Sequence, residues 1–203
     1  MDKPYSIDFI SDIRGRVKQE LKPARYEHTL GVAYTAACMA FLYGEDPLKA
    51  ELAGILHDCA KCYPHEEQIR ICREAGIELG KEELASPAVI HAICGKFLAK
   101  ARYGIEDEDL LNAIGSHTTG RPAMSRLEKI IYIADFIEPL RSEAPNLPEM
   151  RKLAFQDLDE CMYQILMSTI EYLNGKGAPV VPATMDAFVW YKNERDESRD
   201  RQN

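Results

Sequence analysis

Apolar residues recur three or four positions apart along almost the whole chain of 203 residues. This spacing gives an α-helix one apolar face, which can pack against a protein core. No run of alternating β-branched residues is long enough to predict a strand. The pattern therefore predicts an all-α fold.

Capping and breaking residues divide this pattern into separate helices. Ser6 can cap a first helix, and Pro23 can begin a second helix that Gly44 ends. The predicted helices span residues 6–21, 23–44, 47–61, 65–76, 87–103, 107–117, 125–138 and 148–174, and a last one begins after residue 182. The charged tail, residues 193–203, is predicted to be frayed.

Length and composition favour one compact domain. A chain of this size can bury one sizeable core, and the proline-rich stretch 139–150 is short enough for a loop between helices. No apolar run approaches the roughly 18 residues that would span a bilayer. Residues 1–17 lack the uninterrupted apolar core of a secretion signal. We therefore expect a cytoplasmic protein that contacts no membrane.

The formal net charge of −8 disfavours a nucleic-acid partner, because such binding needs a basic surface. An anionic substrate would need local cations to overcome that charge. The six cysteines are expected to be free thiols. Cys59 and Cys62 form a C-x-x-C pair, but neither a second pair nor a βαβ pattern accompanies it. We therefore expect these two thiols in a pocket wall, without zinc or redox chemistry.

Several histidines and aspartates lie in apolar, helix-patterned stretches: His28, the doublet His57-Asp58, His91, His117 and Asp135. A lone histidine on an apolar helix is usually a core residue. A buried carboxylate, in contrast, costs several kcal/mol unless it is paired or bound to a metal. Two such carboxylates with four such histidines predict a metal centre. His65, which opens a polar helix, is expected to face water.

Imidazole and carboxylate ligands without cysteine suit iron, manganese or cobalt in an open site better than a closed structural zinc. Neighbouring side chains on a helix diverge by about 100°. His57 and Asp58 can therefore share one ion only near a helix end, which the break at Pro64 makes plausible. An open coordination position indicates catalysis.

The order of His28, His57-Asp58 and Asp135 resembles the H…HD…D pattern of the HD-domain superfamily of metal-dependent phosphohydrolases. The segments RYEHTLGV, GILHDCAK, HAICG, IGSHTTG and ADFIEPLR are similar to those of the YqeK family within it. This resemblance implies an HD-domain helical bundle with a core at about residues 23–142, on which helices at about 148–195 pack. It also implies a symmetrical hydrolase that cleaves diadenosine tetraphosphate to two ADP, with iron as the expected metal.

The resemblance also implies roles for single residues. The implied metal ligands are His28, His57, Asp58 and Asp135. The implied substrate contacts are Arg25, Lys61, His91, His117, Thr118 and Arg141, to which we add Cys62, Tyr63 and Pro64. Asp58, Lys61, His91 and His117 are the expected catalytic groups, since metal-activated water and nearby cations promote phosphoryl chemistry. Candidate contacts to the base are Ala178, Pro179, Val180, Val181 and Pro182.

Some alternatives stay open at this point. His91 and His117 could instead hold a second ion, although one ion is favoured. The chain could act on another nucleotide, or it could be a non-catalytic HD module that binds a nucleotide. A homodimer through apolar faces of the helix that begins at Pro148 is also expected.

Overall fold

The computed structural model describes residues 5–144 and 146–201, and within them every regular element is a helix. The prediction of an all-α fold is confirmed. The elements are α1 (Ile7–Glu20), α2 (Pro23–Tyr43), α3 (Pro47–Leu56), the 3-10 helix η1 (Cys59–Cys62), α4 (His65–Glu74), α5 (Lys81–Leu84), α6 (Pro87–Tyr103), α7 (Glu108–Ser116), α8 (Arg126–Ile137), α9 (Leu147–Leu153), α10 (Leu158–Gly175) and α11 (Pro182–Asp200).

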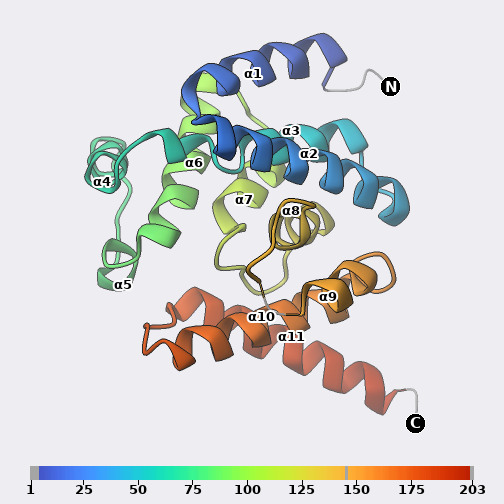
Figure 1. Cartoon of the computed structure of the whole chain (residues 1–203). Coiled ribbons are helices and arrows are strands. Elements are labelled where there is room, and N and C mark those ends of the chain that lie inside the picture. Colours follow the sequence, from blue (N-terminus) through green and yellow to red (C-terminus); the bar gives the residue numbers. More distant parts are fainter. Residues whose placement is uncertain (1–4, 145, 202–203) are drawn as a thin grey trace.

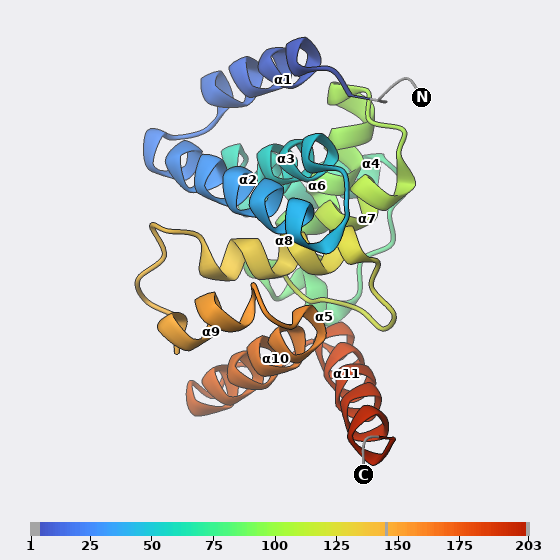
Figure 2. The ribbon, with the colours of Figure 1, turned by 90° about the vertical axis from the view of Figure 1, so that its right-hand side faces the viewer.

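Helices α2, α3 and α8 form the centre of the molecule (Figure 1). Helices α6 and α7 lie beside this centre, α1 covers it at one end, and α9, α10 and α11 form a further layer beyond α8 (Figures 1 and 2). One connected apolar core runs from Ile13 on α1 to Tyr191 on α11. None of the described helices is long and apolar enough to cross a membrane.

Local signals in the sequence explain how the central helices begin and meet. The Ser6 hydroxyl accepts a hydrogen bond from Phe9 N at 3.1 Å, as expected of a helix N-cap. Gly44 ends α2 with a left-handed backbone (φ 71°), which glycine adopts without steric cost. Gly54 lets α3 approach α2 closely, since a Cβ atom there would lie 2.5 Å from Ala33 Cα.

The predicted helix 47–61 ends at Leu56 and is followed by the separate η1, and three further differences from the predicted helices follow. The predicted helix 148–174 is two helices, because the Asp157 carboxylate accepts hydrogen bonds from the amides of Asp159 and Glu160 and so begins α10 separately. The short helix α5 was missed. The tail is helical to Asp200 rather than frayed, and residues 202–203 lie outside the described part.

Candidate metal centre

The His57-Asp58 doublet lies where α3 ends and η1 begins. Asp58 has left the helical conformation (φ −107°, ψ 18°), so its carboxylate turns toward the ring of the preceding histidine. Asp58 Oδ2 lies 3.5 Å from His57 Nε2. Neighbouring side chains inside a helix diverge, but at this helix end the two side chains can point to the same place.

The remaining candidates converge on this doublet from four other helices or helix ends. His91 Nε2 and His117 Nε2 lie 3.1 and 3.7 Å from Asp58 Oδ1. His28 Nε2 lies 3.8 Å from Asp58 Oδ2 and 3.1 Å from Asp135 Oδ1. The structure therefore brings together all six residues singled out in the sequence: His28, His57, Asp58, His91, His117 and Asp135.

Hydrogen bonds at Nδ1 orient all four imidazoles, and the longest of them joins His91 Nδ1 to the Pro87 carbonyl at 3.5 Å. His57 Nδ1 donates to the Gly54 carbonyl and His117 Nδ1 to the Ile114 carbonyl, each at 2.7 Å. His28 Nδ1 donates to Glu138 Oε1 at 3.1 Å. Each bond leaves Nε2 facing the cluster, which is the arrangement that outer partners impose on metal-binding histidines.

Glu138 is the buried residue of this centre that the sequence analysis missed. Its side chain is 2% exposed, and its second oxygen accepts a hydrogen bond from Leu140 N at 2.7 Å. Gly31, one turn after His28, makes room for it, since a Cβ there would lie 2.5 Å from Glu138 Oε2. The signal was present: like Asp135, Glu138 is a carboxylate in an apolar stretch.

The protonation of these groups follows from burial and their partners. Burial lowers the pKa of His57 to about 4 and also lowers that of His91. Burial alone would raise the pKa of Asp58, but His57 and the hydrogen bonds with His117 and His91 hold it well below its usual range. Burial likewise opposes the lowered pKa of Asp135, which the hydrogen bond with His28 outweighs. The centre therefore holds two ionised carboxylates beside neutral imidazoles at His57 and His91. Burial opposes the raised pKa of His28, which the hydrogen bonds with Asp135 and Glu138 outweigh.

This donor set fits a divalent cation. Among the described residues His57 Nε2 is buried without a hydrogen-bond partner, which is costly unless something else satisfies it. The ligand atoms of His28, His57 and Asp58 lie within 4.8 Å of one another. A second such group joins Asp58 to His91 and His117, so ligands for a further ion are also present.

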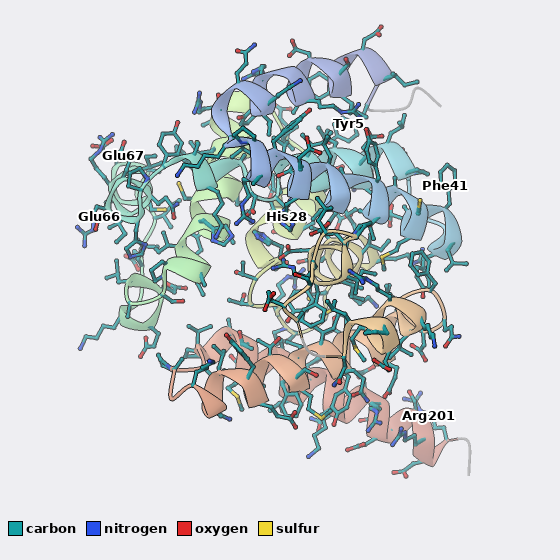
Figure 3. The ribbon with its side chains drawn as sticks, viewed as in Figure 1. Tyr5, His28, Phe41, Glu66, Glu67 and Arg201 are labelled. Atoms are coloured by element: carbon teal, nitrogen blue, oxygen red, sulfur yellow. The ribbon has the colours of Figure 1, made fainter. Side chains whose placement is uncertain are left out.

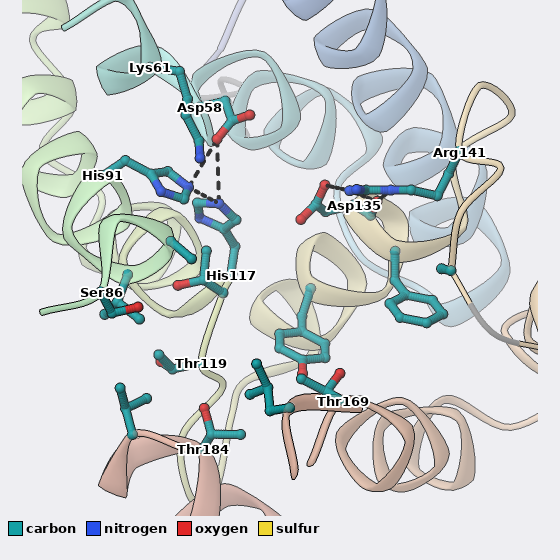
Figure 4. A pocket seen from close by; sticks show the side chains of 18 of the residues that line it. Asp58, Lys61, Ser86, His91, His117, Thr119, Asp135, Arg141, Thr169 and Thr184 are labelled. Carbon is teal, nitrogen blue, oxygen red and sulfur yellow. Dashed lines mark hydrogen bonds and ion pairs between the residues drawn. The ribbon is translucent and has the colours of Figure 1, made fainter. Parts of the chain in front are cut away.

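A cavity of about 390 Å³, here called the metal cavity, opens beside this cluster. Asp58, Lys61, His91 and His117 lie on one side of it, and Asp135 and Arg141 on the other (Figure 4). Arg25 Nη1 is 2.9 Å from Asp58 Oδ2, and Arg141 Nη2 is 2.6 Å from Asp135 Oδ1. Burial lowers the pKa of Lys61, which also lines the cavity. Three cations thus border a cavity in an acidic protein.

A comparison with protein-family models shows which family has these residues. The HD-domain model matches residues 25–140 of the chain, which include all six residues of the cluster. The chain belongs to the HD-domain family. The matched part of this HD protein also includes Arg25 and Glu138.

Relatives of this HD protein cover almost its whole length. The symmetrical bis(5'-nucleosyl)-tetraphosphatase of Bacillus subtilis is 42% identical over 86% of this chain and 92% of its own. Its namesake from Halalkalibacterium halodurans is also 42% identical, over 86% of this chain and 95% of its own. A crystal structure from Clostridium acetobutylicum, described as a predicted HD superfamily hydrolase involved in NAD metabolism, has a TM-score of 0.87 and 44% identity. It covers 94% of this chain and 98% of its own.

The metal cavity is lined by only some of the expected substrate contacts. Thr118 lines it, as do Pro179 and Val181 from the segment before α11. Ala178 and Val180 do not line it, and Pro182 lines a neighbouring cavity instead. His65, expected to face water, is half-buried, and its ring hydrogen-bonds to the Leu84 carbonyl at 3.2 Å.

The segment after Lys61 also lies outside the cavity lining. Cys62 Sγ donates to the Cys59 carbonyl, and the Tyr63 hydroxyl pairs with Arg102. Pro64 is exposed before α4. Neither Cys59 nor Cys62 lines the cavity, so the prediction that they lie in a pocket wall is wrong; all six cysteines are free thiols.

The outer wall of the cavity comes from residues that carry no motif. Tyr132 and Phe136 on α8 and Thr169 and Leu173 on α10 line it. Thr119, which also lines it, lies below His117 in Figure 4. These side chains are ordinary core or surface types in the sequence. Only the packing of α10 and α11 beside α8 brings them to the centre.

Proposed function

We propose that this protein hydrolyses diadenosine tetraphosphate symmetrically, converting the substrate and one water molecule into two ADP. The observation that carries this proposal is the six-residue cluster of histidines and aspartates beside a cavity bordered by Arg25, Lys61 and Arg141. The relatives named symmetrical tetraphosphatases, at 42% identity over nearly their whole length, support it.

One divalent ion, held by His28, His57, Asp58 and Asp135, is the arrangement we favour. Iron is the proposed metal, with manganese and cobalt as alternatives, because mixed imidazole and carboxylate ligands suit these ions. When bound, such an ion would polarise a phosphoryl oxygen and lower the pKa of a coordinated water molecule. His91 and His117 would then be left to face the substrate.

Three cations in the cavity match the charge of a tetraphosphate. The carboxylates of Asp58, Asp135 and Glu138 are equal in number to the cations Arg25, Lys61 and Arg141, so a divalent ion would leave the centre with net positive charge. Arg25 and Arg141 present several N–H groups in a fixed plane, which suits phosphate oxygens. These residues would bind the phosphate chain and stabilise negative charge that develops on it.

His91 and His117 can hold and donate a proton at the site of cleavage. The His117 ring donates from Nδ1 to the Ile114 carbonyl, so in its neutral form Nε2 is an acceptor. His91 Nε2 lies 3.1 Å from that atom and 3.1 Å from Asp58 Oδ1, so a proton on His91 Nε2 would be held between these two acceptors. We assign His91 the role of donor to a phosphate oxygen or to the departing ADP, and His117 the role of orienting it.

The test is anaerobic purification with metal analysis, followed by product identification on diadenosine tetraphosphate. We expect about one metal per chain and ADP as the sole nucleotide product. Asp58→Ala should lose both the metal and ADP formation, whereas Asp186→Ala, an exposed aspartate on α11, should lose neither. A metal-loaded protein that releases no ADP would contradict the proposed reaction, and two metals per chain would contradict the single-ion arrangement.

Two alternatives are separated by the same assay. An HD enzyme for another nucleotide would hydrolyse nucleoside monophosphates or cyclic nucleotides faster than the tetraphosphate. A non-catalytic HD module would bind ADP without hydrolysing any of these substrates. The three cations of the metal cavity favour a longer polyphosphate over both.

A homodimer stays part of the proposal, but its expected surface changes. Most apolar side chains of α10 are buried and serve the core. Helix α2 carries three large apolar residues that are each at least half exposed, Tyr34, Phe41 and Leu42. Figure 3 shows Phe41 pointing outward from this helix. Light scattering of the wild type and of Phe41→Glu tests whether this face holds two copies together.

Cytoplasmic location stays a prediction.

A further inference from the structure

A second cavity, here called the side cavity, adjoins the metal cavity. It has a volume of about 410 Å³ and lies between α5, α6, α7 and the first turn of α11. Val89, Thr119 and Val181 line both cavities, so the two spaces adjoin at these residues. Thr119 is next but one to His117, directly below it in Figure 4. The side cavity is therefore close to the place where the phosphate chain would be cleaved.

The lining of the side cavity combines apolar surface with a few polar groups. Ile93 and Pro182 supply apolar walls, and Lys96 Nζ donates to Asn112 Oδ1 at 2.7 Å. In the described part of the chain no carboxylate lies within 4.0 Å of Lys96 Nζ, so its charge is available to a ligand. Glu82 lines the cavity from α5 and is exposed.

These groups match the parts of a nucleoside phosphate. Apolar walls suit the faces of a base, a carboxylate commonly accepts hydrogen bonds from ribose hydroxyls, and an unpaired lysine suits a phosphate oxygen. Glu82 can serve the ribose and Lys96 the phosphate. No residue of this cavity is used by the metal centre described above.

Cleavage at the centre of the substrate leaves a second nucleotide that needs a binding site. Diadenosine tetraphosphate is cleaved at its centre, so one nucleotide lies on each side of the reacting phosphorus. Ligand cavities usually measure about 300–1,000 Å³, and the metal cavity, at about 390 Å³, is near the lower limit for one small ligand. When one ADP half fills it, the other half must lie outside it, and the side cavity adjoins it at Val89, Thr119 and Val181.

We propose that the side cavity, lined by Glu82, Ile93, Lys96, Asn112 and Pro182, binds the second nucleoside phosphate of the dinucleotide substrate. This inference rests on the proposed function and adds the position of the distal half. It makes the side cavity a specificity site. A substrate that lacks the second nucleoside would forgo its contacts.

Ala183 offers a way to fill the side cavity without disturbing the core. It lines this cavity but not the metal cavity, and it is exposed on the first turn of α11. Ala183→Trp should therefore block the distal nucleoside. Met185→Trp adds the same bulk two residues later on α11, at an exposed position that lines neither cavity, and is the matched control.

The experiment compares kcat/KM for diadenosine tetraphosphate with that for adenosine 5'-tetraphosphate, which lacks the second nucleoside, using the metal-loaded enzyme. We expect the wild type to prefer the dinucleotide by roughly tenfold or more, because unfilled polar contacts are costly. Ala183→Trp should remove most of this preference while inhibition by ADP is unchanged. Lys96→Met removes the charge without filling the side cavity, and it should also raise KM for the dinucleotide. Met185→Trp should behave as the wild type.

Equal kcat/KM of the wild type for both substrates would overturn the inference, since the second nucleoside would then contribute no binding. Equal losses on both substrates in Ala183→Trp, or a matching loss of ADP inhibition, would also overturn it, because the effect would lie in the metal cavity. Failure of the wild type to form ADP from the dinucleotide would instead refute the proposed function. The two failures are therefore distinguishable.

Discussion

Replacement of Glu138 by glutamine tests whether the metal centre depends on its outer hydrogen bonds. One Glu138 oxygen accepts from His28 Nδ1 at 3.1 Å and the other from Leu140 N at 2.7 Å. A glutamine has one acceptor oxygen and one amide group that only donates. Glu138→Gln can therefore satisfy one of the two N–H groups but leaves the other facing a donor.

The size of the effect follows from this lost acceptor. A hydrogen bond to a charged group contributes about 1.5–3 kcal/mol, and loss of an outer partner of a metal-binding histidine lowers metal affinity by about 10–100-fold. Because Glu138 is buried, solvent water cannot replace the missing acceptor. We expect metal affinity to fall by at least about tenfold.

The assay is a chelator competition for the metal, together with ADP formation at increasing metal concentration. Glu138 contacts His28 and not the cavity, so activity should return toward the wild-type value at saturating metal. Glu149→Gln, an exposed glutamate on α9, is the matched control and should change neither measurement. Wild-type metal affinity in Glu138→Gln would refute the reasoning, since His28 would then be oriented by α2 alone.

Three further predictions concern packing, substrate binding and pH. Gly54→Ala should lower the stability by about 1–3 kcal/mol in thermal unfolding, since its Cβ would lie 2.5 Å from Ala33 Cα; an unchanged midpoint would contradict this. Arg141→Ala should lower kcat/KM for the tetraphosphate by about 10–100-fold, and Arg141→Lys should not restore it, because lysine lacks the planar fork that now pairs with Asp135. The folded-state pKa of His57, about 4, lies below its ordinary value of 6.5, so the unfolded chain binds more protons between these values and stability falls as pH falls. The metal-free protein should lose roughly 2 kcal/mol between pH 7 and pH 5 in urea unfolding through this group, and a His57→Gln variant with an equally steep loss would show that other groups are responsible.

The sequence predicted the inner residues of the centre because each of them is a polar residue in an apolar stretch. Such residues are costly to bury, so the sequence alone indicates that they share a purpose. Asp135 was found in this way. Glu138 carried the same signal three residues later and was passed over because the H…HD…D pattern does not include it.

The boundary between α9 and α10 shows a different limit. Helix breaks at Pro64 and Gly76 were predicted from residues that disrupt helices, but no proline or glycine separates Leu153 from Leu158. The break depends on Asp157, which favours a new helix start rather than preventing an old helix from continuing. The wall that α10 adds to the cavity depends on this break and on tertiary packing, so sequence periodicity could not predict it.

The ion pairs of the cavity explain how a chain of net charge −8 can bind a polyanion. Asp58 and Asp135 hold the guanidinium groups of Arg25 and Arg141 at the cavity wall. The same two carboxylates are proposed metal ligands, so a bound cation would take over part of their charge. The N–H groups of both arginines would then be free to turn toward phosphate oxygens. The acidic residues are therefore what keeps the cations in place, and the negative overall charge does not argue against an anionic substrate.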